Sequence, residues 1–180
     1  MLNGVHFCDG FAVATDGFRM SWAECEYKGP SIIIPCDTVR QILDMTGTVR
    51  VSDRQMIIDG DGYRFTTRLI DAKYPDWRRV QPKSFSGEVR FNRADAVSAI
   101  GIAKLGSENA KVTFSGTECV IESDGATSAF NCTGDTVETA FNLVFLEDAI
   151  KKSDSEVVMS IGDSRSASQI GCNVIMPIRR

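Results

Sequence analysis

The sequence is short of the residues that build catalytic and metal centres. It has one histidine, His6, and six cysteines that stand singly, without a Cys-x-x-Cys pair. This leaves no cluster with the ligand spacing of a zinc site. A G-x-S-x-G nucleophile motif and a phosphate-binding loop are also absent. We therefore expect no enzyme, no metal and no cofactor, and we predict that the cysteines are reduced, buried thiols.

The chain also lacks a strong excess of either charge and any long apolar run. Its 20 Lys and Arg residues against 24 Asp and Glu residues give a net charge of -4. Bulk charge thus argues against a protein that wraps nucleic acid tightly, although not against one that encircles it loosely. No apolar run approaches the roughly 18 residues of a membrane helix, and the start does not resemble a signal peptide. We expect a cytoplasmic protein.

What the chain does have is frequent Asp-Gly pairs, which favour tight hairpins between short antiparallel strands. They lie at Asp9-Gly10, Asp16-Gly17, Asp59-Gly60, Asp61-Gly62 and Asp124-Gly125. The DGDG stretch at 59–62 could suggest calcium, but the later ligands of an EF-hand loop are missing. We predict a hairpin turn there.

Three stretches have the periodicity of helices. They are 37–45, with Val39, Ile42 and Leu43 on one face; 93–105, with Val97, Ile100 and Lys104 aligned; and 143–152, with Leu146, Ala149 and Ile150 aligned. Asn92 and Asn142 occupy N-cap positions, with Asp95 at the capping-box position after Asn92. Asp37 is a candidate cap for the first helix.

The helices mark an internal repeat. A short strand precedes each helix (SIIIP, EVRFN, ETAFN) and three strands follow it, so the same unit recurs about every 50 residues. Residues 2–26 contribute strands without a helix before them. They are typical of the back half of a fourth unit whose opening strand and helix are missing.

Paired strand–helix–three-strand units, with helices on one face of antiparallel sheets, resemble the α+β sliding-clamp fold. Four sequence blocks are similar to the bacterial DNA polymerase III beta subunit family in order and spacing: VATDGFRM at 13–20, LIDAKYPDWRRVQP at 69–82, AFN at 140–142 and VIMPIRR at 174–180. The resemblance implies a truncated middle domain at 1–83 and a C-terminal domain at 84–180. Pro75 makes the second block extended, as a link between domains requires.

The resemblance also implies a non-catalytic replication processivity factor. Members of the family bind short linear motifs of polymerases, the clamp loader and repair proteins in a groove between the middle and C-terminal domains. An apolar floor with few fixed polar groups suits leucine and aromatic peptide anchors, and methionines suit a surface with several partners. The matching residues are Leu2, Thr15, Gly17, Phe18, Arg19, Met20, Pro75, Arg79, Val80, Asn142, Phe145, Val174, Ile175, Met176, Pro177, Ile178 and Arg179.

The terminal VIMPI run has a second interpretation from its residues alone. Apolar strands are usually core, so 174–178 is equally typical of a buried closing strand with Pro177 at its unpaired end. Alternating side chains permit both, because successive residues point to opposite faces. The resemblance favours the groove. The final Arg180 differs from a hydrophobic ending in relatives.

The resemblance further implies a ring around double-stranded DNA, with helices facing the central hole. Candidate DNA-facing cations are Arg40, Lys104, Lys151 and Lys152, with Lys111 as a further one. Cys36 and Asp37 stand where the family commonly has basic residues, and Asp44 is expected to offset Arg40. We expect that a chain without the family's N-terminal domain would close a ring, if at all, as a different homo-oligomer. The alternative is a fragment, adaptor or competitor that binds the same partners without encircling DNA.

Overall fold

A computed structural model describes residues 3–163 and 165–178 and divides the chain into two compact units, Met1–Trp77 and Arg78–Arg180. The division follows Trp77, which packs within the first unit against Phe11 and Trp22, with ring centroids 5.4 and 5.9 Å away. It therefore falls earlier than the boundary expected at residue 83. Within the described ranges, no helix has the length and apolar content of a membrane crossing.

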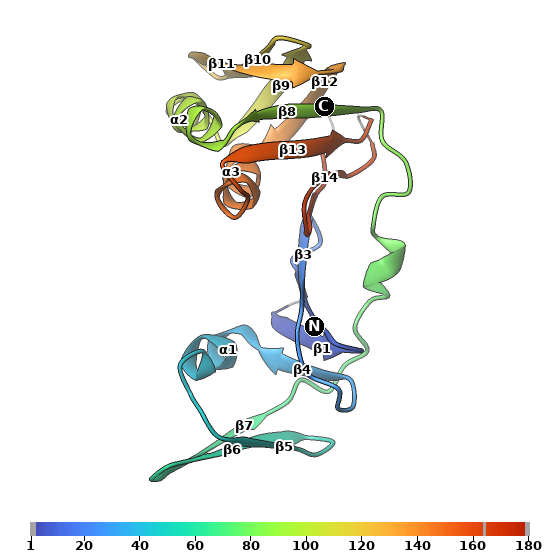
Figure 1. The fold of residues 1–180 in the computed structure, drawn as a ribbon, viewed down its shortest axis with the longest axis vertical. Coiled ribbons are helices and arrows are strands. Elements are labelled where there is room, and N and C mark those ends of the chain that lie inside the picture. Colours follow the sequence, from blue (N-terminus) through green and yellow to red (C-terminus); the bar gives the residue numbers. More distant parts are fainter. Residues whose placement is uncertain (1–2, 164, 179–180) are drawn as a thin grey trace. The chain divides into compact units, whose positions relative to one another are not determined.

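The first unit contains two antiparallel sheets, ordered β4–β1–β2–β3 and β5–β6–β7, and one helix (Figure 1). In chain order the elements are β1 (Gly4–Cys8), β2 (Phe11–Thr15), β3 (Arg19–Glu24), β4 (Ile32–Pro35), α1 (Cys36–Ile42), β5 (Thr48–Val51), β6 (Gln55–Gly60) and β7 (Tyr63–Arg68). The β6–β7 turn at Asp61 and Gly62, with Gly62 at φ 75°, confirms the predicted hairpin.

The second unit contains one antiparallel sheet, ordered β12–β9–β10–β11–β8–β13–β14–β15, and two helices. A short 3-10 helix, η1 (Trp77–Arg79), lies at the division. The remaining elements are β8 (Gly87–Asn92), α2 (Arg93–Ala103), β9 (Asn109–Ser115), β10 (Glu118–Ser123), β11 (Ala126–Gly134), β12 (Thr136–Asn142), α3 (Leu143–Lys151), β13 (Glu156–Ile161), β14 (Ser168–Ile170) and β15 (Asn173–Ile175).

The predicted repeat is confirmed, and the pairing shows how its copies join. We call the strand before each helix (β4, β8 and β12) an opening strand. In the second unit, each opening strand pairs with the first strand that follows the other helix: β8 with β13, and β12 with β9. In the first unit the opening strand β4 pairs with β1. Strands β1, β2 and β3 therefore correspond to the three strands that follow the helix in the other repeats.

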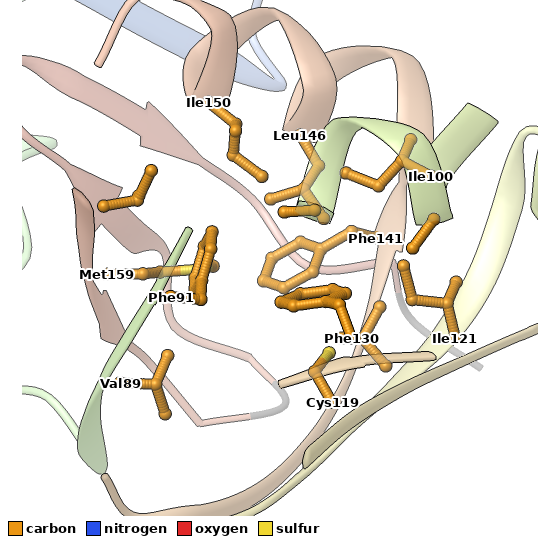
Figure 2. Packing of buried hydrophobic residues seen from close by; sticks show 14 of the residues in the cluster. Val89, Phe91, Ile100, Cys119, Ile121, Phe130, Phe141, Leu146, Ile150 and Met159 are labelled. Atoms are coloured by element: carbon orange, nitrogen blue, oxygen red, sulfur yellow. The ribbon is translucent and has the colours of Figure 1, made fainter. Parts of the chain in front are cut away.

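The core of the second unit lies between its two helices and the sheet. Figure 2 shows Ile100 of α2 and Leu146 and Ile150 of α3 directed toward Phe141 of β12. Phe91 and Phe130 meet edge to face, with ring centroids 5.2 Å apart. Small residues on the buried face of α2 let its backbone approach the sheet, where Ser128 Oγ donates to Ala99 O at 2.8 Å.

The two predicted asparagine caps are confirmed. Asn92 Oδ1 accepts hydrogen bonds from Ala94 N at 2.8 Å and Asp95 N at 3.3 Å. Asn142 Oδ1 does the same for Val144 N at 3.0 Å and Phe145 N at 3.2 Å. Helix α2 stops before the predicted Leu105, because Leu105 N donates to Ile102 O in a tighter turn.

The prediction for α1 was wrong in three details. Pro35 occupies the N-cap position, so Asp37 is not a cap but lies in the first turn. There it pairs with Arg40 at 2.9 Å, in place of the expected Asp44. The helix ends at Ile42, and Leu43 is exposed, because Met45 N donates to Ile42 O and closes a tight turn.

Replacing Asn92 with Ala should lower the free energy of unfolding by about 1 kcal/mol, because two amide groups of α2 lose their acceptor. Urea denaturation followed by circular dichroism would measure this. Asn92→Asp keeps a capping oxygen and should remain within about 0.5 kcal/mol of the original protein. An equal loss in both variants would contradict the capping role.

Candidate functional site

The β2–β3 turn holds four of the predicted binding residues in a fixed conformation. Asp16 Oδ1 accepts from Phe18 N and Arg19 N, both at 3.0 Å, and Asp16 Oδ2 accepts from Arg19 Nε at 3.0 Å. Thr15 Oγ1 donates to Arg19 O at 2.7 Å and accepts from Gly17 N at 3.1 Å. Gly17 lies at φ 93°, a conformation that side chains disfavour.

These contacts make Asp16 the organising residue of the turn. Burial alone would raise the pKa of its carboxyl group, but the hydrogen bonds from Phe18 and Arg19 outweigh burial and hold that pKa below its usual value. The turn directs Phe18 outward, with 66% of its surface exposed, whereas Met20 is only 2% exposed. Phe18 can therefore meet a partner directly, and Met20 can support the surface from beneath.

The predicted linker residues lie on both sides of the division. Pro75 is exposed and belongs to the first unit, between Tyr74 and Trp77, which are buried. Tyr74 stacks on His6 with ring centroids 4.4 Å apart, which anchors this segment to β1. Arg79 and Val80 begin the second unit and are exposed.

The start of α3 supplies two further predicted residues, both in the second unit. Asn142 uses its oxygen to cap α3, and its Nδ2 donates to Asn109 Oδ1 at 3.4 Å. Phe145, in the first turn of α3, is partly buried against the core. A partly covered aromatic ring beside a helix N-terminus can take part in a binding surface, but its position is set mainly by packing.

The terminal VIMPI run combines both interpretations that the sequence left open. Val174 and Ile175 belong to β15 and are 1% exposed, and Ile175 lies in the core cluster. Beyond the strand, Met176 and Ile178 are partly exposed, and Ile178 N donates to Ala140 O at 2.8 Å. The second unit thus holds the run in place. Leu2, Arg179 and Arg180 lie outside the described residues.

Two of the candidate DNA-facing cations share one carboxylate. Lys104 Nζ at the end of α2 pairs with Glu147 of α3, and Lys151 Nζ pairs with Glu147 Oε1 at 2.9 Å. The hydrogen bond from Lys104 lowers the pKa of Glu147 against the opposing effect of burial, and Lys151 lowers it further. The carboxylate is therefore ionised and joins the two helices.

The other candidate cations differ in how far their charge is compensated. Arg40 is paired with Asp37, and Lys111 lies 2.9 Å from Glu138 and 3.9 Å from Glu122. Lys152 is exposed and forms no ion pair within the described ranges. Since α3 also carries Asp148, the three lysines of α2 and α3 stand against two carboxylates, which leaves a net charge of +1.

Sequence reasoning missed the roles of Asp16 and Glu147. For Asp16 a local signal existed, since an aspartate before Gly17 commonly accepts bonds from the amides that follow it. For Glu147 the signal was only partial, because Lys151 is one helical turn away but Lys104 is distant in sequence. In the described part of the chain, no group of His, Cys, Asp and Glu side chains could hold a metal ion.

Glu147→Gln should lower the free energy of unfolding at pH 7 by about 1–3 kcal/mol, because it removes a charged hydrogen-bond acceptor that is largely buried. Since the folded pKa of Glu147 lies below its usual 4.5, this stabilisation is complete above pH 4.5 and is lost as the pH falls through the folded value. Urea denaturation at pH 7 and at pH 3.5 would measure the difference, which should shrink at the lower pH.

Glu138→Gln provides the matched control. Glu138 also pairs with a lysine at 2.9 Å, but its side chain is 63% exposed. We expect a change of at most about 0.5 kcal/mol at either pH. If both variants behaved alike, Glu147 would not hold the two helices together.

Comparison with known proteins shows which families the chain is similar to. The family model for the central domain of the DNA polymerase III beta subunit matches residues 1–76. The beta sliding clamp of Chlamydia trachomatis serovar D is 29% identical over 194 residues, covering 93% of this chain and 47% of that protein. This chain therefore spans about half the length of the curated relatives it matches.

Solved structures extend the match across both units. The DNA polymerase III beta subunit from Thermotoga maritima gives a TM-score of 0.81 at 26% identity, covering 99% of this chain and 58% of that one. The Helicobacter pylori beta clamp bound to a DNA ligase peptide gives 0.84 at 20% identity, covering 98% and 57%, which shows a shared fold. The predicted α+β clamp fold is confirmed, and the family model, the curated relatives and the solved structures all indicate the DNA polymerase III beta subunit, or sliding clamp, family.

Proposed function

We propose that this chain is a non-catalytic replication processivity factor of the sliding-clamp type, acting in the cytoplasm. It binds short linear motifs of DNA polymerase subunits, the clamp loader and repair proteins. The observation that carries the proposal is the match of 99% of the chain to a DNA polymerase III beta subunit, with a TM-score of 0.81. The fixed turn at Asp16 and the tethered segment at 176–178 support it, because preorganised surfaces bind peptides at a lower entropic cost.

The proposed motif-binding residues of each unit divide into two roles. In the first unit, Phe18 provides accessible apolar surface for a leucine or aromatic anchor of a peptide, and Met20 is buried in the strand that follows. In the second unit, Met176 and Ile178 are partly exposed, and Val174 and Ile175 are buried in the strand before them. The Helicobacter pylori clamp structure contains a DNA ligase peptide, and we propose that this chain takes peptides of the same general kind.

For DNA we propose encirclement of a duplex if a ring forms. Such a ring holds DNA by topology, so the compensated lysines of α2 and α3 suffice for loose, salt-sensitive contacts. The second candidate is an adaptor or competitor that binds the same motifs without encircling DNA. The ion pairs of Lys104 and Lys151 with Glu147 favour it, because they reduce the attraction of these lysines for phosphate.

Phe18→Ala and Met176→Ala should each weaken the binding of a labelled peptide with leucine and phenylalanine anchors by about tenfold, because each truncates exposed apolar contact area. Fluorescence anisotropy would give the affinities, and circular dichroism would verify folding. The control is Leu105→Ala, just after α2, where an 85% exposed leucine lies outside the proposed surface. Unchanged affinity in folded Phe18→Ala and Met176→Ala proteins would refute the site.

The native mass separates the ring from the adaptor. A ring former should give one discrete closed oligomer of the 19.7 kDa chain across a range of concentrations, because a closed symmetry has a fixed number of subunits. Light scattering or native mass spectrometry would measure it. A monomer at all concentrations would contradict encirclement and leave motif binding as the function.

A further inference from the structure

The β5–β6–β7 sheet has one face on the core and one face on solvent. Met56 and Ile58 of β6 are buried in a cluster with Val51 and Phe65. Residues directly opposite one another across an antiparallel ladder share a face. The register pairs Arg50 with Ile57, Arg64 with Asp59, and Arg68 with Gln55, so the three arginines all lie on the other face. We call this the arginine face; its residues are Thr48, Arg50, Gln55, Ile57, Asp59, Arg64, Thr66 and Arg68.

The arginine face is positively charged in a chain that is acidic overall. It holds three arginines and one carboxylate, whereas the chain has a net charge of -4. Arg50 and Arg64 have 58% and 66% of their side-chain surface exposed, and Arg68 is exposed as well. Arg68 forms no ion pair in the described part of the chain. The face therefore presents cations to solvent that other residues do not fully neutralise.

Asp59 arranges two of these arginines. Its Oδ2 accepts from an Arg50 Nη and its Oδ1 accepts from Arg64 Nε, so one carboxylate holds two guanidinium groups side by side. The hydrogen bond from Arg64 lowers the pKa of Asp59 and keeps it ionised. Each guanidinium has five N–H donors, of which the ion pair uses few. The remaining donors are preorganised for an external anion.

We propose that the arginine face binds the phosphate backbone of duplex nucleic acid. Guanidinium groups match phosphate oxygens bidentately, which lysine cannot do. The hydroxyls of Thr48 and Thr66 and the amide of Gln55 add neutral groups of the kind that contact phosphates. This inference goes beyond the proposed function, since it requires neither motif binding nor a ring.

The shape of the face favours a duplex over a single strand. Arg64 and Arg68 lie on one side of β7, about 13 Å apart at roughly 3.4 Å per residue. A duplex places one charge per ~1.7 Å of its axis, so this spacing covers several phosphates. Single-strand binders stack bases on aromatic side chains, and the eight residues of the face include none.

The arginine face is a better candidate for phosphate binding than the helices of the second unit, because charges on those helices are more nearly balanced. On α2 and α3, Lys104 and Lys151 share Glu147, which is 11% exposed in its side chain and cannot turn away to solvent. On the arginine face the single carboxylate lies among three cations. Residues 93–104 and 143–152, which contain α2 and α3, carry four cations and three carboxylates, a net charge of +1, whereas the arginine face has a net charge of +2. Net attraction for phosphate is thus greater on the sheet.

The test uses the full chain and a short fluorescein-labelled DNA duplex, with affinity measured by anisotropy between 20 and 200 mM salt. Arg64→Gln/Arg68→Gln should weaken binding at least tenfold at low salt. It should also reduce the slope of log affinity against log salt by about 1.8, which is about 0.9 for each phosphate that the protein no longer neutralises. The matched control is Arg90→Gln/Arg165→Gln, which removes two exposed arginines of the second unit that lie outside the face; Arg90 is paired with Glu88. The control should bind as the original protein does.

Several results would overturn the proposal. These are no duplex binding by the original chain at 20 mM salt, equal losses in both double variants, or poly-glutamate binding as tightly as the duplex. If the double variant does not fold, Arg68→Gln alone decides, because Arg68 forms no ion pair with any other described residue; this variant should weaken binding severalfold and lower the slope by about 0.9. Arginine-dependent duplex binding without motif-peptide binding would support this face while overturning the proposed function.

Discussion

The exchange of opening strands between repeats is the constraint on which the second unit depends. Among the described strands, β8 alone joins β11 to β13, and so connects the strands that follow α2 with those that follow α3. Neither repeat can complete its sheet without the other. The same strand carries Val89 and Phe91 into the core, so sheet pairing and core packing are formed by one element. A strand that is paired on both sides and buried at two positions stabilises the fold through both its ladder and its side chains.

Because each opening strand leads directly into a helix, the exchange also brings α2 and α3 together on the sheet (Figure 1). Their contact is apolar at Ile100, Leu146 and Ile150 and ionic at its edge, where Glu147 meets Lys104 and Lys151. The cost of holding Glu147 largely buried is offset by two cations. This arrangement fixes the helices, but it uses positive charge that the same helices would otherwise present to DNA.

The sequence was sufficient to predict the repeat, the hairpins and the asparagine caps, because each depends on residues close together in the chain. Asn142 and its acceptor bonds lie within one helical turn. The end of α1 was predicted less well, since a hydrogen bond from Met45 to Ile42, and not the apolar pattern, ends the helix. The apolar pattern of the VIMPI run could not show which of its residues are buried. Ile175 is core and Met176 is partly exposed, because burial there depends on the neighbouring elements. The three arginines of β5 and β7 also escaped notice, because it is the ladder register that gathers them on one face.

The proposed motif-binding residues share a physical feature with the arginine face, namely that a carboxylate fixes basic or amide groups in place before any partner arrives. Asp16 holds Phe18 and Arg19 in the β2–β3 turn, and Asp59 holds Arg50 and Arg64 across three strands. In both places the carboxylate is ionised and the groups it orients are exposed. Glu147 makes the same kind of contact, but its own side chain is 11% exposed and lies between helices, whereas those of Asp16 and Asp59 are 43% and 27% exposed. The exposure of the carboxylate therefore separates the two proposed binding surfaces from the contact that joins α2 and α3.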